Sequence, residues 1–75
     1  MIQNKFYERF NALIAERGTK VTWIAKKIRT NAQTVRRWRS GETLPSAENL
    51  MMLAEIFHTS IDYLMGLSDE RSRKQ

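Results

Sequence analysis

The stretch that decides the fold is KVTWIAKKIRTNAQTVRRWRSG, residues 20–41. Apolar side chains recur in it at helical spacing on both sides of a short polar break. These apolar residues are Val21, Ile24, Ala25, Ile28, Val35 and Trp38. The spacing predicts one helix over about 20–28 and a second over about 32–40, joined by three residues only. Such a short connection forces the helices to cross steeply, and the small Ala25 fits where they approach most closely.

Caps and glycines predict three further helices, one over about 3–17, one after Ser46 and a last short one after Ser60. The residues expected to face inward from the first two of them are Phe6, Phe10, Leu13, Leu50, Leu53, Ala54 and Phe57, and the last helix carries Ile61, Leu64 and Met65. Three helices are expected to end at glycines, namely Gly18, Gly41 and Gly66. We therefore predict an all-α, compact five-helix domain over residues 1–67 and a polar, flexible tail or linker over 68–75.

The length and composition describe one small domain. A chain of 75 residues buries only about 60% of its unfolded surface, and a hydrophobic fraction of 41% suffices for a helical core. There is no cysteine and only one histidine, His58, so we expect neither disulfides nor a metal site, and no cofactor. The sequence holds no apolar run long enough for a membrane span and no signal-like leader. These features favour a cytoplasmic protein, in the bacterial cytosol or nucleoid.

The charge is divided into blocks. The net charge is +5, yet residues 17–41 carry eight Lys or Arg and no acid, whereas residues 42–70 carry six acids and no Lys or Arg. A polyanion would be attracted to one side of such a molecule and repelled from the other. The alternative interpretation is an ordinary solvated face. The density of cations in 17–41 favours nucleic acid over that alternative.

The ordered set of motifs resembles the lambda-repressor-like, Cro-type helix-turn-helix regulators, also called the XRE family. The matching stretches are Glu16–Gly18, Ile24–Ile28, Thr34–Gly41, Pro45–Ser46, Leu50, Leu53–Glu55 and Ser60–Leu67. The resemblance covers about residues 6–67. It implies a transcriptional regulator, typically a repressor of phage or bacterial type, that binds double-stranded operator DNA and reads the major groove with the helix over 32–40. It also implies a palindromic operator, a homodimer at least on DNA, and an antirepressor or polymerase as a possible protein partner.

The resemblance assigns roles by position. Base-edge contacts are expected from Ala32, Gln33, Arg36 and Arg37. Gln33 is placed to pair with adenine through two hydrogen bonds, and Arg37, one turn further along, with guanine. Ala32 suits a thymine methyl group, and Arg36 either a base or a phosphate. Phosphate contacts are expected from Lys20, Asn31, Thr34, Ser40 and Thr43.

Several residues depart from the family pattern. Arg29 stands where a turn glycine is usual, which costs roughly 1 kcal/mol if the left-handed conformation is kept. Glu42 replaces a common cation of the loop. The family often pairs an arginine with a glutamate at the positions that Ile14 and Arg39 occupy here, so both charges of that pair are missing together. Arg39 is therefore expected to turn toward DNA or toward Glu16.

The aromatic residues have two interpretations. Trp38 lies at helical spacing from Val35 and is expected in the core rather than stacked on a base. Trp23 shares no stripe with Ile24 and is expected to be partly exposed, against a neighbouring helix or, alternatively, DNA.

An enzyme is not expected, because the sequence shows no nucleophile–base constellation, no phosphate-binding glycine loop and no metal-ligand spacing. The competing class is a protein-interaction module, antirepressor-like or antitoxin-like, built on the same fold. Its contact surface would include Val21, Trp23 or the last helix. An operator-binding domain would show a steep salt dependence and a sequence preference, and an interaction module would show neither.

Overall fold

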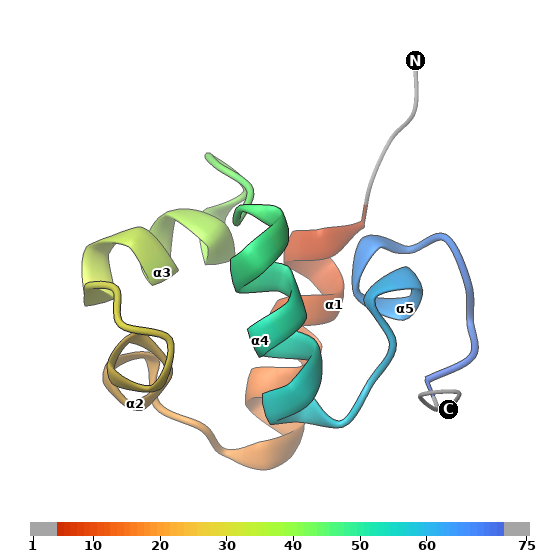
Figure 1. Ribbon diagram of the computed structural model, residues 1–75, viewed down its shortest axis with the longest axis horizontal. Coiled ribbons are helices and arrows are strands. Elements are labelled where there is room, and N and C mark those ends of the chain that lie inside the picture. Colours follow the sequence, from red (N-terminus) through yellow and green to blue (C-terminus); the bar gives the residue numbers. More distant parts are fainter. Residues whose placement is uncertain (1–4, 72–75) are drawn as a thin grey trace.

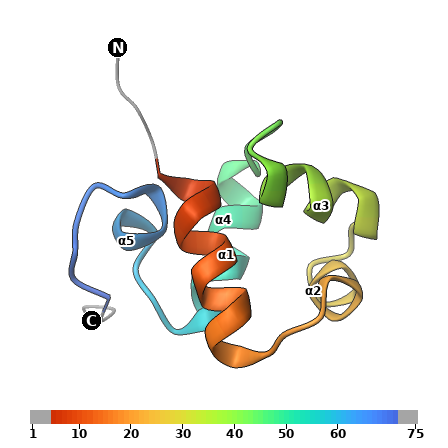
Figure 2. The same ribbon diagram turned by 180° about the vertical axis from the view of Figure 1, so that it is seen from behind.

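The computed structural model describes residues 5–71, which form five helices and no strand. The helices are α1 (Phe6–Arg17), α2 (Val21–Lys27), α3 (Ala32–Ser40), α4 (Ala47–Phe57) and α5 (Ile61–Met65). α1 and α4 form the middle of the molecule, with α2 and α3 on one side and α5 on the other (Figures 1 and 2). The all-α, five-helix prediction is confirmed. The first two residues of the predicted first helix, 3 and 4, lie outside the described residues. None of the described helices is long and apolar enough to cross a membrane.

Side-chain caps begin three of the helices. Asn31, Ser46 and Ser60 each accept a hydrogen bond from the backbone N–H three residues later, which satisfies one of the free donors of the first turn. The predicted glycines Gly18, Gly41 and Gly66 end α1, α3 and α5 in the left-handed conformation. At Gly66 a side chain would also clash with the residue before α1, since a Cβ atom there would lie 2.8 Å from the Cβ of Lys5.

The core is built around a cluster of aromatic rings. Phe10 stacks on Phe6 with ring centroids 5.1 Å apart and contacts the edges of Trp38 and Phe57 at 6.2 and 6.1 Å. All four side chains are buried, as the sequence predicted. Edge-to-face and offset-stacked contacts suit the charge distribution of aromatic rings. The cluster therefore joins α1, α3 and α4 into one core.

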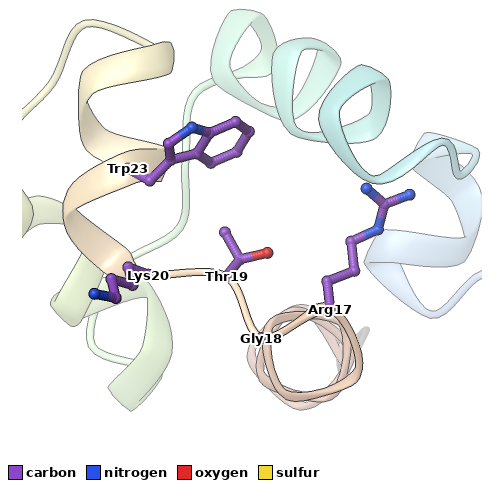
Figure 3. A pocket seen from close by; sticks show the side chains of 5 residues that line it. All are labelled: Arg17, Gly18, Thr19, Lys20 and Trp23. Carbon is purple, nitrogen blue, oxygen red and sulfur yellow. The ribbon is translucent and has the colours of Figure 1, made fainter.

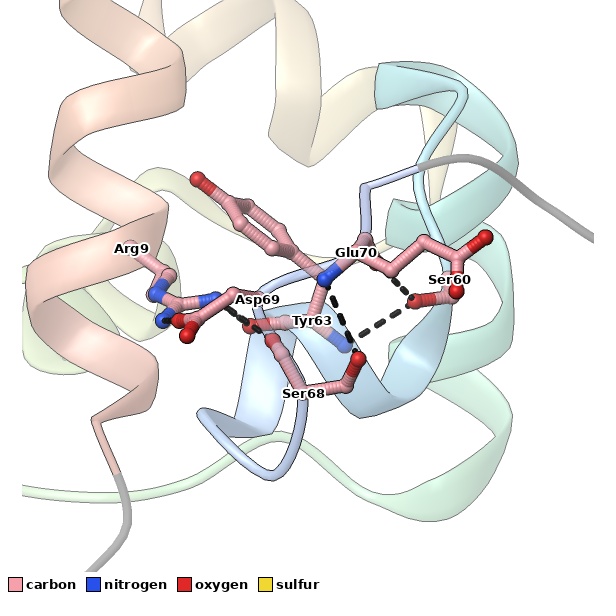
Figure 4. Close-up of polar contacts among 6 residues, drawn as sticks. All are labelled: Arg9, Ser60, Tyr63, Ser68, Asp69 and Glu70. Atoms are coloured by element: carbon pink, nitrogen blue, oxygen red, sulfur yellow. Dashed lines mark hydrogen bonds and ion pairs between the residues drawn. The ribbon is translucent and has the colours of Figure 1, made fainter.

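Arg9 of α1 fastens the segment that follows α5. We name residues 67–71 the strap. Nη1 of Arg9 donates to the carbonyl oxygens of Tyr63 and Ser68 at 3.0 and 2.9 Å, and Nη2 donates to the carboxylate of Asp69 at 2.9 Å (Figure 4). The guanidinium also lies 4.1 Å from the centre of the Tyr63 ring. One side chain of α1 thus holds both α5 and the strap.

The end of the strap returns to the start of α5. Ser60 donates its hydroxyl to the Glu70 carbonyl at 3.2 Å (Figure 4). Its backbone N–H donates to the Arg71 carbonyl at 3.0 Å. Arg71 in turn donates to Glu16 of α1 at 2.9 Å. Residues 68–71 of the expected tail are therefore bonded to the helical body. The domain boundary at residue 67 and a flexible tail stay predictions, and residues 72–75 lie outside the described residues.

Candidate nucleic-acid interface

α2 and α3 form a tight helical pair. Figure 1 looks along the axis of α2, while α3 runs across the view, so the two helices cross steeply. The turn closes through a 2.8 Å hydrogen bond from the Thr30 N–H to the Ala25 carbonyl. Arg29 adopts φ 59°, so the left-handed conformation is kept although an arginine stands in place of the usual glycine. Ala25 is buried and lets the helices approach, as predicted.

α3 has a buried face and an exposed face. Val35 and Trp38 are 0% and 2% exposed and fix the helix to the core. Gln33, Arg36 and Arg37 are exposed on the other side. Ala32, the fourth predicted base-reading residue, is half-buried in the first turn. The helix therefore presents one amide and two guanidinium groups outward on a backbone that the core holds in place.

The predicted phosphate-contacting residues lie before α2, and before, within or just after α3. Lys20 precedes α2, Asn31 precedes α3, and Ser40 and Thr43 lie near the end of α3, all of them exposed. The side-chain oxygen of Asn31 accepts from both the N–H and the hydroxyl of Thr34, at 2.8 and 3.0 Å. The Ser40 hydroxyl donates to the Arg37 carbonyl at 3.0 Å. The hydroxyls of Thr34 and Ser40 thus already donate to Asn31 and to the Arg37 carbonyl. Lys20 is the one cation among these predicted contacts.

The cations of residues 17–41 are not neutralised internally. Between described residues there are two ion pairs, Arg9–Asp69 and Arg71–Glu16, and neither involves a cation of 17–41. Exposed, unpaired cations attract a polyanion most strongly at low salt, where screening is weak. The positive charges of residues 17–41 therefore remain available to attract an anion from the solvent.

A shallow hollow of about 320 Å³ opens beside the start of α2. Trp23 and Arg17 stand on either side of it, with Thr19 between them, while the Lys20 side chain points away (Figure 3). Trp23 is 45% exposed, which confirms the predicted partial exposure, and the Lys27 ammonium lies 5.5 Å from its ring centre. The indole borders this hollow and stays outside the core.

Arg39 does not bond to Glu16, one of the two partners predicted for it. Its Nε donates to the side-chain oxygen of Asn11 at 2.7 Å, and Glu16 is bonded to Arg71 instead, while a contact of Arg39 with DNA stays a prediction. The amide nitrogen of Asn11 also donates to the Arg39 carbonyl at 2.8 Å. No prediction from the sequence singled out Asn11. The available signal was its position three residues before Ile14, which places it on the same side of α1.

The comparisons with known proteins agree with this geometry. A family model described as helix-turn-helix matches residues 12–64. The chain belongs to the helix-turn-helix family. The resemblance to the XRE-type regulators is thereby confirmed, and residues 12–64 of this helix-turn-helix domain include all the predicted base-reading and phosphate-contacting residues.

Named relatives are regulators. An uncharacterized HTH-type transcriptional regulator of Haemophilus influenzae is 36% identical over 62 residues, which is 83% of this chain. The domain spans about a quarter, 26%, of that relative's length.

Two solved structures share the fold. A transcriptional regulator from Listeria innocua matches with a TM-score of 0.85 and 40% identity, over 97% of this chain and 68% of that one. The DNA-binding domain of the P22 c2 repressor matches with a TM-score of 0.78 and 25% identity, over 100% of this chain and 96% of that one.

Proposed function

We propose that this helix-turn-helix domain binds double-stranded operator DNA in a sequence-specific manner as part of a transcriptional regulator, with α3 in the major groove. The observation that carries the proposal is the two-sided character of α3. Val35 and Trp38 anchor it in the core, while Gln33, Arg36 and Arg37 face the solvent within an unpaired cationic surface. The names of the relatives and structural neighbours support the same function.

The residues of α3 contact different groups of the DNA. Gln33 pairs with an adenine and Arg37 with a guanine, because both side chains match those base edges with two hydrogen bonds. Arg36 contacts a base or a phosphate, and Ala32 lies against a thymine methyl group. Phosphate contacts that set the register come from Lys20, Asn31, Thr34, Ser40 and Thr43.

The regulator acts as a repressor in the cytoplasm and as a homodimer at least on DNA. A two-fold symmetric pair of domains would place α3 in successive major grooves about 34 Å apart, which requires a palindromic operator. The P22 c2 match, a repressor by name, supports repression. The domain acts by binding, without catalysing a reaction, and an antirepressor or polymerase would act on it through a separate surface.

Selection from a random duplex pool, followed by binding titrations at 50 and 200 mM salt, tests the proposal. We expect one enriched, palindromic sequence and a loss of affinity on the order of a thousandfold between the two salt concentrations if about six phosphates are contacted. A protein-interaction module would enrich no sequence and would show no such salt dependence. That outcome would overturn the proposal.

A further inference from the structure

Asn11 and Arg39 form a polar clamp between α1 and α3. The amide nitrogen of Asn11 donates to the Arg39 carbonyl at 2.8 Å, and Nε of Arg39 donates to the Asn11 side-chain oxygen at 2.7 Å. The side chain of Asn11 therefore uses both its donor and its acceptor on the same residue of α3. Two short hydrogen bonds between Asn11 and Arg39 fix the orientation of α3 relative to α1 as well as the distance between them, because hydrogen bonds weaken when they are bent.

The clamp lies at the carboxyl-terminal end of α3, where that helix meets α1. Trp38 packs on Phe10 there, and a Cβ atom at Gly41 would lie 3.5 Å from the ring of Tyr7. These neighbouring contacts are apolar, and apolar burial is non-directional. The paired hydrogen bonds are the directional part of the joint.

The base-reading end of α3 lies far enough from this joint to amplify any rotation there. Gln33 precedes Arg39 by six residues, so it lies roughly 9 Å away along the helix axis. A pivot of about 10° at Arg39 would displace Gln33 by roughly 1.5 Å. Specific contacts need placement within about 0.5 Å. A small loss of orientation at the clamp therefore suffices to spoil a two-bond contact with a base.

We infer that Asn11 is a positioning residue for DNA recognition, which sets the angle of α3 without touching DNA itself. The inference rests on the proposed function and extends it to α1. It assigns to Arg39 a role that differs from that of the exposed guanidinium groups of Arg36 and Arg37.

The test is selection from a randomised duplex pool with the wild-type chain, Asn11→Ala and Ala12→Gly, at a temperature where each is folded. The readout is affinity for the best sequence relative to random duplex. Ala12 is an exposed residue of the same helix, and glycine there weakens α1 through helix propensity alone. We expect Asn11→Ala to lower the ratio roughly tenfold, the discrimination supplied by about one base contact, and Ala12→Gly to leave it close to wild type. Equal ratios for Asn11→Ala and wild type, or equal losses in both variants, would overturn the inference.

Arg39→Met completes a double-mutant cycle and also serves if Asn11→Ala does not fold. Arg39 is exposed, and methionine keeps its stem while it removes the Nε donor. The single variant should lose less selectivity than Asn11→Ala, and the double variant should be no worse than Asn11→Ala. If the selectivity losses of the two single variants added up in the double variant, Arg39 would contact DNA independently of Asn11. If Arg39→Met kept wild-type selectivity, the bond from its Nε to Asn11 would play no part in positioning α3. Either result contradicts the inference. If the wild-type chain enriches no sequence, the proposed function itself fails.

Discussion

The two ends of the molecule treat their charges in opposite ways. At the recognition end, formed by α2 and α3, the side-chain hydrogen bonds to the other described elements are the two of the Asn11–Arg39 clamp. At the opposite end, formed by α5 and the strap, Arg9 of α1 bonds to α5 and to the strap, and Arg71 of the strap bonds to Glu16 of α1. One end leaves its cations exposed to the solvent, and the other uses its charges in contacts between its own elements.

This difference explains how a small domain can carry a cationic surface. Unpaired like charges destabilise the compact state by repulsion. Here the eight uncompensated cations lie within residues 17–41, and the six acidic residues of the following segment lie within residues 42–70. The comparison predicts that variants at the α5 end change stability, and that variants on the exposed face of α3 change DNA selectivity.

The largest effect is expected at the core contact between α3 and α1, where Trp38 meets Phe10. Trp38→Ala removes a side chain that is 2% exposed and that contacts Phe10. We expect a loss of about 3–5 kcal/mol in the free energy of unfolding, a large fraction of the stability of so small a domain. Circular dichroism during thermal unfolding measures it, with Trp38→Phe as the milder control. A loss below about 1 kcal/mol would contradict the buried placement of Trp38.

Arg9→Met is expected to have the next largest effect. It tests whether the α5 end affects stability without affecting DNA selectivity. It leaves the carbonyl oxygens of Tyr63 and Ser68 without their charged donor, which should cost roughly 1.5–3 kcal/mol. Urea unfolding measures the loss, and selectivity for DNA should be unchanged because α3 keeps its own contacts.

Asp69→Asn is the matched control for Arg9→Met. The Arg9 side chain is 15% exposed but that of Asp69 is 100% exposed, so removing the carboxylate charge should matter little. An equal loss for Asp69→Asn would mean that the ion pair, rather than the two carbonyl bonds, fastens the strap.

Thr59→Val should stabilise the domain. Thr59 is 1% exposed, and its hydroxyl has no hydrogen-bond partner among the described residues. Replacing that hydroxyl by a methyl group of similar size removes a buried, unsatisfied polar group and should gain about 1 kcal/mol. Thr59→Ser keeps the hydroxyl and deletes the methyl group, so its stability should fall. Chemical denaturation of both variants checks the opposite signs, and a destabilised Thr59→Val would contradict them.

The smallest effect concerns Glu16 and pH. The hydrogen bond from Arg71 lowers the pKa of the Glu16 carboxyl below its ordinary value. Because the folded-state pKa is depressed, the stabilisation is fully present above the ordinary glutamate pKa of about 4.3 and disappears as the pH falls through the lowered pKa. The difference in Tm between wild type and Glu16→Gln should therefore be small near neutrality and vanish in acid. A difference that grows toward acid would have the wrong sign.

Local signals made most of the fold predictable. Asn31, Ser46 and Ser60 cap helices because each side chain bonds only three residues ahead, and the buried residues recur at helical spacing. The exposed face of α3 followed from the same periodicity. The roles proposed for Gln33 and its neighbours toward DNA stay predictions.

Contacts between distant residues were not predictable. Asn11 and Arg39 are 28 positions apart, and Arg9 reaches residues 54 to 60 positions away. No pattern in one helix specifies such a partner, because the partner depends on how the helices pack. For that reason Glu16 was one of the two partners predicted for Arg39, beside DNA, although Arg39 bonds to Asn11 and Glu16 to Arg71.

The most direct test of the account compares Gln33→Ala and Arg37→Ala with Lys20→Ala on the selected duplex and on single-base variants of it. Each α3 variant should lose about 1–3 kcal/mol of binding and relax the preference at one base position, whereas Lys20→Ala should weaken all duplexes alike and reduce the salt slope by about one. Wild-type affinity and selectivity in both α3 variants would contradict the claim that the exposed face of α3 reads the sequence.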